Sequence, residues 1–465
     1  MDKQYDVIVV GGGAAGMFAA VQAGYAGAKV LLLEPNERLG KKLYITGKGR
    51  CNLTNNCSWQ EVLKNVPTNP RFLYSALSGF TPEDAITFFE SHGCETKTER
   101  GNRVFPVSDK SASVVEALKT ALGYAGAEIR RARAKELLVE DGHISSVRTD
   151  RGDFFAPAVI LATGGRSYPA TGSTGDGYRL AEALGHSVVD PVGSLVPLVE
   201  EGDCCAQMQG LALRNISLRL YEAAEEATGN RQQATGPVCH SERSEESVFP
   251  VSGTGRERIA AAGVRTGLAM TEGKRGYSGK PVFEDFGELL FTHFGLSGPV
   301  ILSASAHMEQ GKRYVVSIDL KPALDEATLD ARILRDFAAA KNRSFENALS
   351  GLYPKTMIPV MVARSGIPGD TRVNAVTREQ RRALLELTKH FTVAIRGKRP
   401  VEEAIVTSGG VSVKEIDPKT MESKLVPGLY FAGEVMDVDA YTGGFNLQIA
   451  WATAFAAAAA AASKK

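Results

Sequence analysis

The sequence is poor in cysteine, has no excess of either charge and contains no apolar run long enough to cross a membrane. Its six cysteines are scattered over 465 residues, and none forms a C-x-x-C pair. Paired spacing is typical of structural zinc sites, and dense cysteine is typical of secreted, disulfide-linked domains. We therefore expect no disulfide framework and no metal site, and a reducing cytoplasm suits such a chain.

Charge and hydropathy exclude further classes. Lys and Arg number 54 and Asp and Glu 53, so the net charge is only +1. A protein with a net charge close to zero has no overall electrostatic attraction to nucleic acid or to an anionic membrane. The apolar run Ile449 to Ala462 is shorter than the ~20 residues that span a bilayer, so we expect a buried final helix. These features predict a cytoplasmic protein with a small-molecule substrate and without a nucleic-acid or membrane partner.

The most informative feature is the N-terminal glycine motif. An apolar strand, Tyr5 to Val10, runs into Gly11-Gly12-Gly13-Ala14-Ala15-Gly16, and a predicted helix from Ala14 to Ala26 leads to a second apolar strand, Lys29 to Leu33. Continuous apolar strands are typical of a parallel sheet that is buried on both faces. The pattern predicts a dinucleotide-binding βαβ unit.

Each residue of this motif has a physical role. Gly11 permits the tight turn, Gly13 leaves room for a pyrophosphate, and Gly16 allows the helix to pack closely on the strand. The phosphates are expected to lie on free amide groups at the start of the helix. Glu34 ends the second strand, where its carboxylate can accept hydrogen bonds from ribose hydroxyls.

The middle of the chain changes in character, and its length suits two or three domains. A glycine-rich and cation-rich loop is expected from Gly40 to Asn55. Helices are predicted at 81–92 and 111–125, and strands at 128–133, 135–140, 143–149, 153–155 and 158–165. Strands at 213–222, 287–292 and 314–320 suggest a small barrel or sandwich, and residues 324–390 have helical spacing. The polar segment 225–280 is predicted to be a disordered surface insertion without a catalytic role.

A second glycine motif lies near the C-terminus. A strand runs to Gly433, Glu434 follows, and Gly443-Gly444 opens a helix near Asn446. A nicotinamide dinucleotide needs only the first βαβ unit, whereas a longer ligand needs a further contact along the sheet edge. We therefore predict FAD, with Glu434 on its ribityl or ribose-phosphate side and the positive end of the helix toward the flavin pyrimidine.

Five ordered motifs carry a family resemblance. They are Val10 to Gly16, Gly47 to Asn55, Ala162 to Gly177, Leu290 to Pro299 and Gly433 to Asn446. With them the chain resembles the HI0933-like flavoproteins, which include BaiN-type bile-acid reductases and proteins labelled aminoacetone oxidases. One departure is Lys48, where relatives usually have glycine.

The resemblance implies an α/β fold with a Rossmann-like FAD-binding domain built from both chain ends, residues 1–190 and 396–465. An inserted β-rich, barrel-like subdomain would occupy 191–322 and a helical subdomain 323–395. FAD is the implied cofactor and NAD(P)H the transient reductant. The predicted cofactor-binding residues are Gly11, Gly13, Ala14, Ala15, Gly16, Glu34, Lys42, Gly49, Arg50, Cys51, Asn52, Ala134, Thr163, Gly164, Gly433, Glu434, Gly444, Asn446 and Leu447.

Side chains for catalysis are harder to select, because a flavin supplies the redox chemistry itself. His293, in a glycine-containing and serine-containing turn, is a candidate proton donor or substrate anchor, and so is Tyr168, which follows a strand edge. A packing role would account for either. Cys51 and Cys57 are separated by five residues rather than the four of flavoprotein disulfide reductases, so buried or loop thiols are expected.

The sequence thus predicts an FAD-dependent oxidoreductase that uses NAD(P)H to reduce a carbonyl-conjugated C=C bond in an apolar small molecule. One alternative is a flavin oxidase that transfers electrons from a small amine to O₂. Another is a flavin-bearing protein that modifies RNA through a local basic face, with Arg378 to Arg382 and Arg396 to Arg399 as its candidates.

Overall fold

We analysed a computed structural model of the chain, which describes residues 4–223, 277 and 279–463. Most of the predicted insertion at 225–280 lies outside the described residues. The described part forms two compact units. The first comprises Met1–Leu218, Phe283–Gly311 and Val393–Lys465, and the second comprises Arg219–Val282 and Lys312–Thr392. The boundaries predicted at 190, 322 and 395 stay predictions, because this division groups 283–311 with the chain ends.

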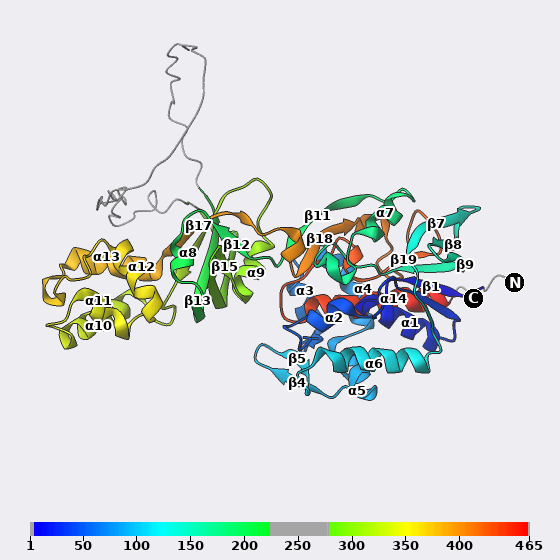
Figure 1. Cartoon of the computed structure of the whole chain (residues 1–465), viewed down its shortest axis with the longest axis horizontal. Coiled ribbons are helices and arrows are strands. Elements are labelled where there is room, and N and C mark those ends of the chain that lie inside the picture. The colour runs from blue at the N-terminus through cyan, green and yellow to red at the C-terminus, as the bar shows by residue number, and fades with distance from the viewer. Residues whose placement is uncertain (1–3, 224–276, 278, 464–465) are drawn as a thin grey trace, which may run out of the picture. The chain divides into compact units, whose positions relative to one another are not determined.

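A five-stranded parallel sheet forms the centre of the first unit (Figure 1). Its order is β19-β10-β1-β2-β6, with β1 at Val7–Val10, β2 at Val30–Leu33, β6 at Glu128–Arg130, β10 at Ala158–Leu161 and β19 at Leu429–Phe431. All residues of β1, β2, β10 and β19 are buried. The Rossmann-type fold predicted from the apolar strands is confirmed.

The register of these strands brings their carboxyl ends to one edge. Val10 pairs with both Leu33 and Leu161, Leu33 pairs with Arg130, and Leu161 pairs with Phe431. The residues that follow the strands, including Gly11, Glu34 and Ala162, therefore emerge side by side. Ligands of open α/β sheets bind at this edge.

Helices from opposite ends of the chain cover the sheet. Helix α1, Ala14–Tyr25, lies beside α14, Phe445–Ala462 (Figure 1). Among the described helices, α14 is the one long and apolar enough to cross a membrane, but 67% of it is buried within the fold. Trp451 is fully buried, and its indole nitrogen donates to the Leu53 carbonyl at 2.8 Å. The predicted buried final helix is thus confirmed.

Smaller elements complete the first unit. Its other helices include α2 (Lys41–Ile45), α3 (Trp59–Lys64), α4 (Tyr74–Gly79), α5 (Pro82–Ser91), α6 (Ser111–Tyr124) and α7 (Asp176–Glu182). Three small sheets join β3 (Thr54–Asn55), β5 (Arg103–Pro106) and β4 (Thr96–Glu99); β7 (Ala134–Glu140), β8 (His143–Thr149) and β9 (Gly152–Phe155); and β11 (Val188–Ser194) with β18 (Val406–Val411). The segment 40–55 is therefore not a loop throughout, since α2 and β3 lie within it.

The predicted barrel or sandwich is a closed six-stranded barrel. Its order is β12-β15-β14-β13-β16-β17, formed by Leu198–Glu200, Gly295–Ser297, Phe283–Thr292, Ala212–Glu222, Tyr314–Asp319 and Phe391–Lys398. The short helices α8 (Cys204–Gln207) and α9 (Pro299–Ser305) also belong to this part of the chain. The helical spacing of 324–390 corresponds to α10 (Glu326–Ala339), α11 (Phe345–Ala348), α12 (Ile358–Ser365) and α13 (Arg378–Lys389).

Candidate functional site

The glycines of the first motif have different structural roles. A Cβ atom on Gly16 would lie 1.7 Å from the Gly11 carbonyl oxygen, and one on Gly11 would lie 2.5 Å from the Ala162 carbonyl oxygen. These two positions therefore require glycine for packing. A Cβ atom on Gly13 would meet no described atom within 4 Å. This open space lies at the start of α1, which has no side-chain cap, and it suits a pyrophosphate on free amide groups.

Glu34 lies against the same turn. Its carboxylate accepts hydrogen bonds from the Gly12 amide at 2.7 Å, the Asn36 amide at 2.8 Å and the Asn36 side chain at 2.7 Å. Glu34 is only 8% exposed. These donors fix the carboxylate at the end of β2, beside the glycine turn, where the sequence predicts a ribose.

The second predicted acid, Glu434, belongs to a connected polar group. Lys42 Nζ lies 2.7 Å from Glu434 Oε2 and donates to Ser167 Oγ at 2.6 Å. Glu434 Oε1 also accepts from the Thr407 amide at 2.8 Å. The structure thus joins Lys42 and Glu434, two predicted residues far apart in sequence. Ser167 lies within the Ala162 to Gly177 motif but is not among the predicted cofactor-binding residues. Thr407 lies in β18, outside every motif.

Thr163 follows β10 at the sheet edge, but its side chain does not face open space. Its Oγ1 is buried against Gly177, where a Cβ atom would lie 2.0 Å away, and it has no hydrogen-bond partner within the described part of the chain. The open space at Gly13 and the fixed carboxylate of Glu34 are therefore the features that fit the predicted FAD.

The start of α14 is built by close backbone packing. Gly444 has a φ of +97°, and a Cβ atom there would lie 2.3 Å from the Thr54 carbonyl oxygen. Asn446 accepts from the Ala440 amide at 2.9 Å and donates to the Ala440 carbonyl at 2.6 Å. Leu447 is half-buried against the core. The helix begins at Phe445, close to the predicted start, and has no side-chain cap.

The Gly47 to Asn55 segment has strained backbone positions. Lys48 has a φ of +58° and Cys51 a φ of +61°, a region that favours glycine. Glycine, which relatives usually have at position 48, adopts this backbone conformation without strain. Lys48 adopts it with a side chain, so the departure from the family pattern adds strain at this position. Gly49, with a φ of +82°, adopts the same region without this cost.

Arg50, predicted to contact phosphate, is engaged by carboxylates. Its Nε donates to Asp109 at 2.7 Å, and its Nη1 donates to Glu99 at 3.2 Å. The guanidinium also lies 4.2 Å from the centre of the Phe105 ring. The hydrogen bonds to Glu99 and Asp109 raise the pKa of Arg50. Arg50 thus anchors its loop to β4 and β5, and its phosphate contact stays a prediction.

The remaining predicted cofactor residues lie at element ends. Ala14 and Ala15 open α1, and Ala134 opens β7. Gly164 has a φ of +75° and Gly433 a φ of +73°, each shortly after a strand of the sheet. These placements are consistent with ligand contact, and the residue roles stay predictions.

The two predicted catalytic side chains are both on the surface. His293 lies in the exposed turn between β14 and β15, where its ring packs edge-on against Phe294 at 5.0 Å. Tyr168 is 37% exposed and has a φ of +51°. Neither is enclosed, so a catalytic role for either stays a prediction.

A polar pair that the sequence did not reveal lies beside the second glycine motif. His307 Nε2 and Tyr441 Oη are 2.7 Å apart. Tyr441 directly precedes the Thr442-Gly443-Gly444 segment, which is a signal that could have found it. His307 follows α9 and has no neighbouring motif, so only the fold identifies it.

No disulfide joins the described cysteines. Burial raises the pKa of Cys51 far above its usual value and that of Cys57 to about 11. Such thiols remain protonated and unreactive, in agreement with the predicted buried or loop thiols. Glu200, Cys204 and Cys205 place ligand atoms within 4.8 Å of one another. The Glu200 carboxylate accepts from the amides of both cysteines, at 3.2 and 2.8 Å, so it caps α8.

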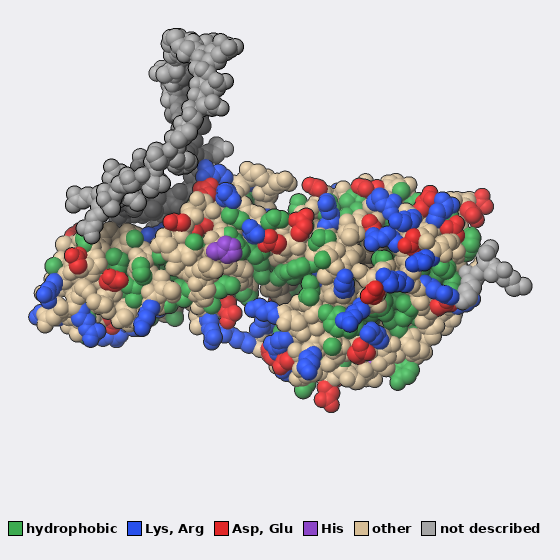
Figure 2. Space-filling model, in the orientation of Figure 1, with side chains coloured by type: hydrophobic (Ala, Val, Ile, Leu, Met, Phe, Trp, Pro, Cys, Tyr) green, Lys and Arg blue, Asp and Glu red, His purple; other side chains and the backbone are tan. Residues whose placement is uncertain are grey.

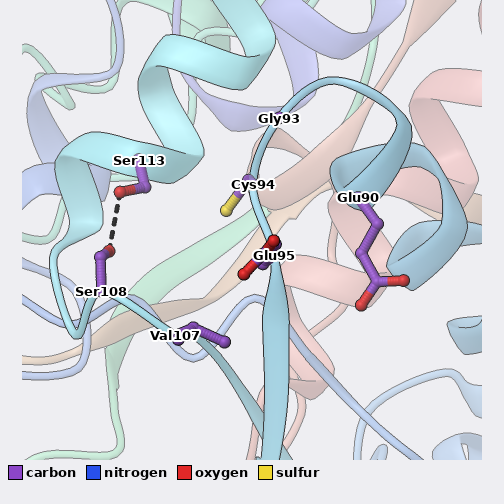
Figure 3. Close-up of a pocket in the computed structure, with 7 residues that line it drawn as sticks. All are labelled: Glu90, Gly93, Cys94, Glu95, Val107, Ser108 and Ser113. Carbon is purple, nitrogen blue, oxygen red and sulfur yellow. Dashed lines mark hydrogen bonds between the residues drawn. The ribbon is translucent and has the colours of Figure 1, made fainter.

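One pocket lies apart from these residues. It has a volume of about 460 Å³ and is formed where α5, β4, β5 and α6 meet. Figure 3 shows its lining, which is Glu90, Gly93, Cys94, Glu95, Val107, Ser108 and Ser113. It contains none of the predicted cofactor residues.

His186 lies apart from the cofactor residues, and its side chain is fully buried. Its Nδ1 lies 3.2 Å from Glu415, and its Nε2 lies 2.9 Å from Ser423 Oγ. It packs edge-on against Phe431 at 5.0 Å. His186 is therefore a core residue behind the sheet edge.

Comparisons with known proteins agree with this architecture. A model of the HI0933-like protein Rossmann domain matches residues 5–460. A 3-dehydro-bile acid delta(4,6)-reductase of Clostridium scindens is 30% identical over 463 residues, with 98% of both chains covered. Ribosomal RNA dihydrouridine synthases of Escherichia coli and Haemophilus influenzae are 29% and 28% identical, again with 98% of both chains covered. The chain therefore belongs to the HI0933-like family and is an FAD-dependent oxidoreductase.

Proposed function

We propose that the protein reduces a C=C bond conjugated to a carbonyl group, with FAD as the resident carrier and NAD(P)H as the transient reductant. The observation that carries this proposal is the reaction type in the names of its relatives. A 3-dehydro delta(4,6) bile acid has its C=C bonds conjugated to a ketone, and a dihydrouridine synthase saturates a uracil C=C bond beside a carbonyl. Both names describe addition of hydrogen across the same kind of bond.

The site supports this proposal through what its residues can do. Gly13 and the start of α1 would hold the pyrophosphate, and Glu34 a ribose. Lys42 pairs with Glu434, whose carboxylate would accept hydrogen bonds from ribityl hydroxyls. When bound, FAD would supply two-electron transfer to the substrate. The uncapped start of α14 would stabilise negative charge on the reduced ring.

We favour an apolar small molecule as substrate, because charge on this protein is balanced. Lys and Arg side chains are interspersed with Asp and Glu on the face shown in Figure 2. Two of the arginines considered for RNA binding are paired, Arg381 with Asp330 at 2.7 Å and Arg399 with Glu403 at 2.6 Å. Phosphate backbones attract clusters of cations that are not neutralised in this way.

A uracil within ribosomal RNA is the second candidate, favoured by the two dihydrouridine synthases among the relatives. The discriminating experiment supplies NADPH-reduced enzyme, without oxygen, with either a 4-en-3-one steroid or protein-free ribosomal RNA. Reoxidation of the flavin by the steroid, with a saturated product, supports the first candidate. Dihydrouridine in the RNA supports the second. Peroxide release on addition of a small amine, without NAD(P)H, would contradict both.

A further inference from the structure

The His307–Tyr441 pair packs against Phe283 and lies near the buried carboxylate of Asp439. The Phe283 ring stacks on His307 at 4.8 Å and meets Tyr441 edge-on at 6.1 Å. Asp439 is only 1% exposed, and its carboxylate accepts from Ser194 at 2.7 Å and from Ser408 at 3.0 Å. The His307 and Tyr441 rings are both half-buried. Phe283 thus packs against both rings, and part of each residue remains accessible.

The charges around the pair set its protonation. Burial lowers the pKa of His307, Asp439 opposes this change, and Lys398 reinforces it. Burial raises the pKa of Tyr441, and the carboxylates of Asp439 and Asp285 reinforce that increase. At neutral pH the imidazole is therefore uncharged and the phenol keeps its proton. A protonated phenol beside an uncharged imidazole can give up a proton and recover it.

The backbone around Tyr441 is fixed toward the start of α14. The Tyr441 amide donates to the Asn65 carbonyl at 2.9 Å, and Asn446 holds the preceding residue, Ala440, on both its amide and its carbonyl. On the other side, Asn55 donates to the Gly443 carbonyl at 3.0 Å. Tyr441 is therefore rigidly joined to the helix start where the proposed function places the flavin ring.

Saturation of a conjugated C=C bond needs a hydride at the carbon β to the carbonyl and a proton at the α carbon. The two acids predicted from the sequence, Tyr168 and His293, lie on the surface. We propose that Tyr441 is the catalytic acid that protonates the α carbon of the substrate, and that His307 is the positioning residue that returns the proton. This inference rests on the proposed function.

The step balances as follows. When bound, reduced FAD would supply the hydride that adds to the β carbon, and NAD(P)H would supply its two electrons. The Tyr441 O–H bond breaks and a C–H bond forms at the α carbon, which leaves a phenolate. The phenolate takes the proton of His307 Nε2 while water protonates His307 Nδ1, so the imidazole stays uncharged and changes tautomer. Proton exchange with water then restores the Nε2–H tautomer. One hydride and one proton are thus added to the substrate, and the proton comes from solvent.

The test uses Tyr441→Phe, which removes the hydroxyl and keeps the ring. Tyr124→Phe, at a tyrosine of α6 that is 76% exposed, is the matched control, and Tyr168→Phe tests the rival acid. FAD affinity by fluorescence quenching, the rate of flavin bleaching by NADPH, and binding of the saturated ketone product by absorbance shift are expected to stay within about twofold of wild type. Reoxidation of the pre-reduced enzyme by the substrate is expected to slow about 10²-fold to 10³-fold in Tyr441→Phe. His307→Gln is expected to slow it about tenfold.

Three results would overturn the inference. Wild-type rates of reoxidation in Tyr441→Phe would exclude Tyr441 as the acid and leave the proposed function intact. A large loss in Tyr168→Phe alone would transfer the role to Tyr168. Failure of wild-type enzyme to be reoxidised by any conjugated carbonyl compound or RNA would overturn the proposed function, and this inference with it.

Discussion

At the scale of single residues, the glycines of the N-terminal motif have different structural roles. Gly11 and Gly16 allow backbone segments to touch, whereas Gly13 leaves space open at the start of α1. The sequence motif predicts all three glycines, because their spacing follows from the geometry of a βαβ turn. It does not separate the packing glycines from the one that faces a ligand. Only the surroundings of each Cβ position do that.

Gly13→Val is expected to give folded but colourless protein. The added side chain meets no described atom of the fold, yet it would occupy the space proposed for the pyrophosphate. We expect the 450 nm absorbance of purified protein to be lost while the circular dichroism spectrum is unchanged. Gly16→Val is the control, and its side chain would collide with the Gly11 carbonyl, so this variant should not fold. A yellow, folded Gly13→Val protein would contradict the assignment.

Because His186 is buried, we predict that the free energy of unfolding decreases in acid. Burial lowers the pKa of His186 below its ordinary value of 6.5, so the fold favours the neutral ring. The stability that this provides is fully present above pH 6.5 and is lost as the pH falls through the lower, folded pKa. Between pH 7 and pH 5 we expect wild type to lose about 1 kcal/mol more than His186→Gln. Parallel urea-unfolding profiles of the two proteins would refute this.

At the scale of helices and strands, a feature could be predicted when the residues that define it lie close together in the sequence. The helix predicted at 81–92 is marked by capping residues within its own first turn. In the structure, α5 begins with a complete capping box between Thr81 and Asp84. The pairing of Lys42 with Glu434 has no such local signal, because it joins α2 to the segment after β19. Thr407 and His307 were missed for the same reason. Neither lies in a motif, and the fold alone gives each its neighbours.

Asn446 is expected to control how firmly the start of α14 is held. Its side chain makes two hydrogen bonds to the Ala440 backbone, so Asn446→Ala should cost about 1–3 kcal/mol of stability. We expect FAD affinity, measured by fluorescence quenching, to weaken about tenfold. Asn347→Ala is the matched control, since Asn347 is an exposed residue that donates to Ser344. Equal FAD affinity in both variants would show that the hydrogen bonds between Asn446 and Ala440 are not needed for cofactor binding.

At the scale of the whole molecule, the two ends of the chain build one sheet. Strands β1 and β2 come from the N-terminus and β19 from the C-terminus, and their carboxyl ends align. The apolar runs and two glycine motifs predicted this closure. The domain boundaries at 190, 322 and 395 stay predictions, because the segment Phe283–Gly311, which contains the barrel strands β14 and β15, groups with the sheet.

The polar segment 225–280 is predicted to be dispensable for catalysis. Ala223 and Tyr277 form an antiparallel bridge, and such neighbours can be joined by a short turn. We expect replacement of residues 224–276 by Asn-Gly to leave FAD content and the rate of flavin bleaching by NADPH within twofold of wild type. A folded, yellow variant that NADPH no longer reduces would assign the segment a catalytic role.

The central claim is that electrons pass from NAD(P)H through a bound FAD to a conjugated C=C bond. Its most direct test is the anaerobic absorbance spectrum of the purified protein, recorded before and after NADPH or NADH and again after an enone is added. The account predicts a yellow protein whose 450 nm band bleaches with one of the nucleotides and recovers with the enone. Protein that stays colourless even after added FAD, or a yellow band that neither nucleotide bleaches, would contradict it.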